Sequence, residues 1–141
     1  MSVKIMIPVN DSAAARHAVE AVLRYRDKFL LPVTLLHVVD TDKLAYRMIP
    51  EFQVEMVRDR AREAGETLLK KMAEQFFAAG VETVTRIELG SPRETICKIA
   101  NEEAFDLVII GRHGMGEVRD VLFGSVANHV MHKVTCPVLL I

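Results

Sequence analysis

Hydrophobic residues along this chain follow two spacings that alternate from one end to the other. Short apolar runs of strand length are each followed by a stretch in which apolar residues recur every three or four positions, as in amphipathic helices. The runs that predict strands cover residues 3–9, 32–40, 81–89, 105–111 and 136–141, and the stretches that predict helices cover 12–29, 51–79, 91–104 and 124–133. This alternation predicts a parallel sheet with helices on both faces.

The expected topology is a single doubly wound α/β domain over residues 1–141, with five strands in the order 3-2-1-4-5. Right-handed crossovers leave few other arrangements. Strands 1 and 4 are then neighbours, and the winding reverses between them. Ligands of open α/β sheets bind beyond the carboxyl ends of the strands at such a reversal. The two loops that meet there follow Val9 and Ile110.

Two of the predicted strands should differ in how many of their faces are covered by other elements. The run 81–89 alternates apolar and polar residues, which is typical of a strand with one wet face at the edge of a sheet. The run 105–111 has almost no alternation, which favours a central strand covered on both faces.

Several residues mark where the helices should begin and end. Asp11 or Ser12 is the expected N-cap of the first helix, and Gly80 is the expected end of the long one. Ser91 and Glu94 have the spacing of a capping box, with Pro92 at the first helical position between them. The long helix should pack on the sheet through one stripe made of Val54, Val57, Ala61, Ala64, Leu68, Met72 and Phe76.

Composition narrows the class of protein. The chain has 141 residues, enough for one domain with a core of its own. Its formal net charge of −1 gives no general attraction to nucleic acid or to an anionic membrane. No apolar run approaches the ~18 residues that span a bilayer. Because Cys97 and Cys136 lack CxxC spacing and no signal peptide is recognised, we expect a cytoplasmic protein with reduced thiols.

The segment from Gly111 to Val130 carries the candidate chemistry. Gly111, Gly114 and Gly116 directly follow a predicted central strand, and Gly124-Ser125 then opens a helix. Free N–H groups and the dipole at a helix start favour an anion, so backbone amides could hold phosphates without a lysine. Neither the P-loop pattern nor the GxGxxG fingerprint is present. Spacing alone leaves two interpretations open, a phosphate site and a flexible turn followed by a glycine N-cap.

The same segment, "GRHGMGEVRDVLFGSVANHV", resembles the universal stress protein family, whose nucleotide-binding members carry G-x2-G-x9-G-[S/T]. Gly111, Gly114 and Gly124-Ser125 have this spacing. The resemblance extends over the whole chain: "IMIPVNDS" is similar to the first strand and loop of the family, "LLHVVD" to its second strand and "GSPRETICKIA" to the entry of its third helix.

This resemblance implies an ATP-binding domain that usually forms a homodimer. By position, residues that would contact the adenosine are Pro8, Val9, Asn10 and Val38, those near ribose and phosphates are Gly111, His113 and Gly114, and those on the phosphates are Gly124, Ser125 and Val126. Two positions depart from a common form of the pattern. Asn10 stands where the family usually has Asp, and Ala127 where some nucleotide binders have a hydroxyl residue.

Other polar residues suggest simpler roles. His129 and His132 have no third ligand at metal spacing, so no metal site is expected. His37 lies inside an apolar strand and is expected to be a hydrogen-bonded structural residue. Arg112 and Arg119 are expected on the solvated surface. The segment Pro137–Ile141 carries no charge and should form an edge strand through which two copies pair.

Three functions fit this pattern. The first is a dimeric stress-response regulatory protein that binds ATP or AMP, with no catalytic residues of its own. The second is a slow ATPase or autophosphorylating enzyme that would require Mg²⁺, with His113 or Ser125 as candidate groups. The third is a dimeric interaction module without nucleotide, an alternative suggested by Asn10 and Ala127.

Overall fold

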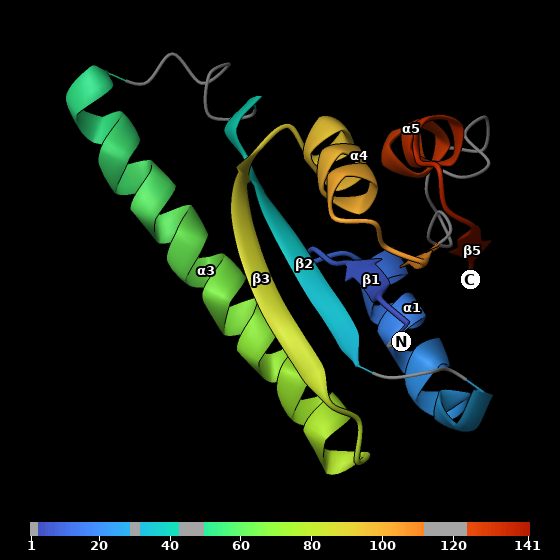
Figure 1. Cartoon of the computed structure of the whole chain (residues 1–141). Coiled ribbons are helices and arrows are strands. Elements are labelled where there is room, and N and C mark those ends of the chain that lie inside the picture. Colours follow the sequence, from blue (N-terminus) through green and yellow to red (C-terminus); the bar gives the residue numbers. More distant parts are fainter. Residues whose placement is uncertain (1–2, 29–31, 43–49, 112–123) are drawn as a thin grey trace.

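Five parallel strands form one sheet between two layers of helices (Figure 1). The computed structural model describes residues 3–28, 32–42, 50–111 and 124–141. The strands are β1 (Ile5–Pro8), β2 (Val33–Asp40), β3 (Thr83–Gly90), β4 (Leu107–Ile110) and β5 (Val138–Leu140). Their order in space is β3-β2-β1-β4-β5, which confirms the predicted topology. β3 and β5 are the edges, and β4 lies inside the sheet, as the two contrasting patterns predicted.

The helices divide between the two faces of the sheet. They are α1 (Ala13–Arg24), α3 (Glu51–Ala78), α4 (Pro92–Glu102) and α5 (Ser125–Lys133), and a short 3-10 turn η1 (Arg26–Lys28) follows α1. Buried residues of α1 and α3 pack against one face, and those of α4 and α5 against the other. None of the described helices has the length and apolar character needed to cross a bilayer.

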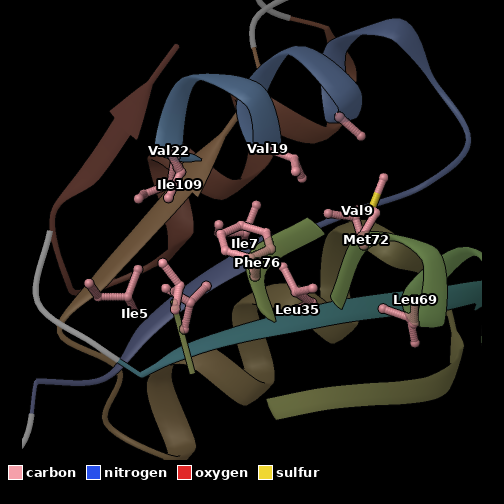
Figure 2. Packing of buried hydrophobic residues seen from close by; sticks show 13 residues of the cluster. Ile5, Ile7, Val9, Val19, Val22, Leu35, Leu69, Met72, Phe76 and Ile109 are labelled. Atoms are coloured by element: carbon pink, nitrogen blue, oxygen red, sulfur yellow. The ribbon is translucent and has the colours of Figure 1, made fainter. Parts of the chain in front are cut away.

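Each face of the sheet has its own core, because neighbouring residues of a strand point to opposite sides. Ile5 and Ile7 of β1 belong to the cluster under α1 and α3, whereas Met6 between them belongs to the cluster under α4 and α5. Figure 2 shows the first cluster, in which Phe76 of α3 lies among side chains of β1 and β2. Phe76 and Ile7 are both 0% exposed, so the centre of this layer is closed to solvent.

The predicted N-caps and the predicted end of the long helix are confirmed, but the predicted capping box is wrong. The Ser12 hydroxyl caps α1 by accepting the Ala15 N–H at 3.1 Å, and Gly80 follows the end of α3 with a φ of 78°. The capping box at Ser91 does not form, because the Ser91 side chain makes no capping hydrogen bond. Ser91 is nevertheless the N-cap of α4, because its backbone carbonyl accepts the Thr95 N–H, the first bond of the helix, and Pro92 has no N–H that needs a partner.

The predicted stripe on α3 is only partly right. The buried residues of this helix are Gly65, Leu69, Met72 and Phe76, whereas Ala64 is exposed. The prediction missed Gly65 because it looked for large apolar side chains, and here the sheet approaches the helix backbone itself. None of the residues Glu51–Ala64 is buried, so only the second half of α3 packs tightly on the sheet.

Candidate functional site

A cleft of about 470 Å³ opens at the carboxyl edge of the sheet. It lies where β1, β2 and β4 end and where α1, α4 and α5 begin. The residues that line it are Pro8, Val9, Asn10, Ser12, Ala14, Ala15, Leu36, Val38, Asp40, Pro92, Ile96, Ile110, Gly111 and Gly124 to Ala127. Since β1 and β4 are neighbours and the winding reverses between them, the cleft occupies the expected position.

The cleft brings together residues that are far apart in the sequence. The predicted site residues that line it are Pro8, Val9, Asn10, Val38, Gly111, Gly124, Ser125 and Val126. His113 and Gly114 lie outside the described residues, as do Arg112 and Arg119. That the predicted site residues contact a nucleotide remains a prediction, both for those that line the cleft and for His113 and Gly114.

Two hydrogen bonds fix the end of β1. The Val9 N–H donates to the Leu36 carbonyl at 2.8 Å, and the Val9 carbonyl is 2.9 Å from the His37 Nδ1. His37 is therefore a hydrogen-bonded residue of the sheet, as predicted. Together these contacts hold the backbone just before Asn10, where the chain turns along the cleft.

Gly111 permits a close contact between β4 and α1. A Cβ atom at this position would collide with the backbone carbonyl of Ala14 in the first turn of α1. Only glycine avoids this collision without a movement of the backbone. The residue thus sets how closely the end of β4 approaches the start of α1, and both elements line the cleft.

The start of α5 differs from the start of α1. Gly124 is the N-cap of α5, with a φ of 78°, and supplies no side-chain hydrogen bond to the first turn. The first backbone N–H groups of a helix have no acceptor within it, and an uncapped helix start offers them to an anion. In α1, by contrast, the Ser12 hydroxyl already accepts one of these groups. The α5 end of the cleft is therefore suited to phosphate or carboxylate groups.

The other end of the cleft is mainly apolar. Leu36 and Val38 of β2 meet Ile96 of α4 there, and all three are buried. Among the described residues that line the cleft, Asp40 is the only charged one. Its Oδ1 accepts the Asp42 N–H at 3.0 Å. The arrangement suits a flat, largely apolar group next to an anionic one.

A comparison with protein families decides the affiliation of the chain. The sequence profile of the universal stress protein family matches residues 1–141. The chain belongs to this family.

Relatives within the universal stress protein family are similar to this chain in sequence, and one of them also in its solved structure. Universal stress protein MJ0577 of Methanocaldococcus jannaschii is 28% identical, over 98% of this chain and 93% of its own length. Its solved structure superimposes with a TM-score of 0.85 and covers all of this chain and 96% of the other. Universal stress protein YxiE of Bacillus subtilis is 25% identical, over 98% of this chain and 97% of its own length.

A plant structure extends the comparison at the level of the fold. The universal stress protein family protein from Arabidopsis thaliana, solved with AMP bound, is 22% identical and has a TM-score of 0.72. The match covers 99% of this chain and 90% of the plant chain.

Sequence reasoning on this universal stress protein missed part of the cleft lining. The missed residues are Ser12, Ala14, Ala15, Leu36, Asp40, Pro92, Ile96 and Ile110, while Ala127 was noted only as a departure from the family pattern. Asp40 and Pro92 could have been found, because each lies at the carboxyl edge, at a strand end or a helix start. Leu36 and Ile96 could not, because buried apolar residues that line a cleft look like core residues in the sequence.

The two cysteines of this universal stress protein lie away from the cleft lining and are free thiols. Burial raises the pKa of the Cys97 thiol and, as the largest of several influences, that of Cys136. A raised pKa keeps a thiol protonated and poorly nucleophilic. Neither cysteine is therefore a candidate for nucleophilic chemistry.

Proposed function

We propose that this universal stress protein binds an adenine nucleotide, ATP or AMP, in the cleft at the carboxyl edge, and that it acts as a stress-response regulatory protein. One observation carries the proposal. The uncapped start of α5 faces the same cleft as the apolar residues at the end of β2. A nucleotide has the matching division into a flat base and anionic phosphates.

The proposed orientation follows from the two ends of the cleft. The base lies against Val38 and Ile96, and the phosphates lie against Gly111 and the first turn of α5 at Ser125. A volume of about 470 Å³ falls within the range of ~300–1,000 Å³ of small-molecule sites. Because the described lining contains no cation, Mg²⁺ would accompany ATP and offset its charge.

The AMP in the Arabidopsis structure supports an adenine nucleotide as the occupant, since that protein has the same fold. Titration with ATP and with AMP distinguishes between the two nucleotides in this chain.

Isothermal titration of nucleotide-free protein with ATP and with AMP, each with and without Mg²⁺, tests the proposal. Gly114→Val should abolish binding, because the spacing of the family's glycine pattern predicts that this residue lies next to the phosphates. Lys70→Ala, on the exposed side of α3 and away from the cleft, is the matched control. Absence of binding by the wild type, or full binding by Gly114→Val, would contradict the proposal. Release of phosphate from labelled ATP above the Gly114→Val level would favour the slow-enzyme alternative.

The proposed dimer uses β5, the short edge strand. Val138 and Leu140 pack against the core, whereas Leu139 is 36% exposed. Leu139→Lys therefore places a charge at the proposed interface without removing a core side chain, and it should shift the protein from dimer to monomer. Light scattering at micromolar concentration measures this. A monomeric wild type would refute the dimer and leave the nucleotide proposal standing.

A further inference from the structure

The carbonyl of Val9 needs a partner from outside the backbone of the sheet. The last residue of β1 that pairs with β2 is Pro8, which lies opposite Leu36. Val9 follows it and is only 5% exposed. A buried carbonyl without a partner is strongly unfavourable. The described structure supplies the partner from a side chain, the His37 Nδ1 at 2.9 Å.

The ring of His37 has room only because α3 has a glycine opposite it. A Cβ atom at Gly65 would lie 2.5 Å from the His37 Cδ2 and 3.0 Å from its Nε2. It would also lie 2.9 Å from the Ile87 Cδ1 on β3. Glycine in a helix interior is unfavourable compared with alanine, so its presence in the middle of α3 needs a packing reason. The imidazole of His37 provides that reason.

We propose that His37 is a positioning residue for the nucleotide site. It donates from Nδ1 to the Val9 carbonyl and is held in place by the α3 backbone at Gly65. It thereby sets the direction in which the chain leaves β1 toward Asn10. This inference rests on the proposed function for its effect on binding. Neither His37 nor Gly65 lines the cleft, so both act through Val9, which does.

The protonation pattern of the ring separates this role from simple packing. A carbonyl can only accept, so the Nδ1 must carry a proton in the neutral ring. A histidine that merely fills space has no such requirement. Nitrogen-15 NMR of the imidazole identifies the protonated nitrogen directly. We expect the proton of the neutral ring on Nδ1, and a proton on Nε2 alone would overturn the proposal.

Four variants test the connection from α3 to the cleft. His37→Leu removes the donor, His37→Asn keeps an N–H donor near the position of Nδ1, and Gly65→Ala displaces the ring. His17→Leu, an exposed histidine on α1, is the matched control. The two readouts are hydrogen exchange of the Val9 amide, measured without nucleotide, and affinity for ATP. Far-UV circular dichroism establishes that each variant is folded.

His37→Leu and Gly65→Ala should each weaken ATP binding and speed exchange of the Val9 amide by about tenfold, as expected for the loss of one buried hydrogen bond. His37→Asn should return both values to within about threefold of wild type, and His17→Leu should change neither. Unchanged exchange and affinity in His37→Leu would overturn the proposal. If His37→Leu does not fold, Gly65→Ala and the ring tautomer decide.

If the protein does not bind a nucleotide at all, these measurements give a different pattern from the one expected if only the positioning role is wrong. The wild type would then not bind ATP, while the ring tautomer and the exchange of the Val9 amide would still report whether His37 holds this turn. Wild-type binding that His37→Leu and Gly65→Ala leave intact would instead refute the positioning role alone.

Discussion

The described residues form a cleft and a groove of nearly equal size, and of these two the cleft alone has the features of a ligand site. The cleft at the carboxyl edge has a volume of about 470 Å³, and a groove between α3 and the free edge of β3 has about 510 Å³. Volume alone would therefore favour the groove. The two hollows differ in the chemical groups that line them.

Side chains of both charges line the groove. Glu66, Lys70 and Glu74 come from α3 and Arg86 from β3, so the charges largely cancel. Arg86 is already engaged, because it donates to Glu88 at 3.0 Å and to Glu103 at 2.6 Å. The cleft instead joins the ends of three strands to an uncapped helix start. The comparison teaches that converging backbone ends indicate a site better than volume does.

The largest expected effect concerns the close contact that shapes the cleft. Gly111→Ala should lower the free energy of unfolding by about 3 kcal/mol, because the new methyl group meets the Ala14 carbonyl and the backbone has to move. Gly80→Ala is the control, since this residue has a φ of 78° and nothing within 4 Å of its Cβ position. It should cost only about 1 kcal/mol. Urea denaturation measures both, and equal losses would show that the contact at Gly111 is not tight.

A smaller effect, on ATP affinity, should distinguish the cleft from the groove. Ser125→Ala should weaken ATP binding about fivefold, because it removes one hydroxyl at the α5 end of the cleft. Lys70→Ala should leave ATP affinity within about twofold, although it removes a cation from the larger groove. Isothermal titration measures both variants. A stronger loss in Lys70→Ala than in Ser125→Ala would reverse the assignment of the site.

Removal of the Asp40 charge should change ATP affinity to a smaller extent. Asp40→Asn retains a carbonyl oxygen for the Asp42 N–H but removes a negative charge from the cleft. Repulsion of the phosphates should fall, so affinity for ATP should rise about two- to threefold, and that for AMP should rise less. The two affinities are measured at low and high salt. An equal gain for both nucleotides at high salt would point to a cause other than charge.

The smallest expected effect concerns Glu103, the ion-pair partner of Arg86 in the groove. The hydrogen bond from Arg86 holds the pKa of the Glu103 carboxyl below its ordinary value of 4.5. A carboxyl whose pKa is lower in the folded than in the unfolded state stabilises the protein at pH values above its ordinary pKa. This contribution is lost as the pH falls through the pKa of the folded state. Since the Glu103 side chain is 40% exposed, Glu103→Gln should cost about 0.5 kcal/mol or less at neutral pH.

Urea denaturation at pH 7 and at pH 3 checks this prediction. The difference between wild type and Glu103→Gln should shrink on acidification, because the protonated carboxyl no longer pairs with Arg86. A difference that grows at pH 3 would contradict the assigned direction. In either case, ATP affinity at neutral pH should be the same in both proteins, since Glu103 lies outside the cleft lining.

The fold could be predicted from the sequence because its signals are local and repeated. The change of hydrophobic spacing identified the five strands and the helices α1, α3, α4 and α5, and crossover handedness left few orders, among them the one observed. Errors arose in how individual residues are used. Ser91 is the N-cap of α4 but makes no side-chain capping hydrogen bond, and Gly65, which has no side chain to mark it as part of the apolar stripe, is buried against the ring of His37.

The residues alone marked the candidate site where glycine or polar residues break an apolar pattern, whereas Pro8, Val9, Val38 and Val126 were placed there only through the family resemblance. Asn10, Gly111 and Gly124 interrupt their surroundings and were found, and all three line the cleft. Ile96 faces the same cleft from α4 but continues the periodicity of a core helix, so nothing in the sequence distinguishes it. The hydrogen bond of His37 was expected, whereas its partner, a main-chain carbonyl, carries no signature in the sequence.

The exposure of the first half of α3 has a consequence for proteolysis. No residue of Glu51–Ala64 is buried, and in Figure 1 this part of the helix diverges from β3. Its turns are held by their own hydrogen bonds, without a core beneath them, and isolated helices of this length are marginal in water. Among the described residues, trypsin should therefore cut native protein first at Arg58, Arg60 and Arg62, and the sheet should outlast that cleavage.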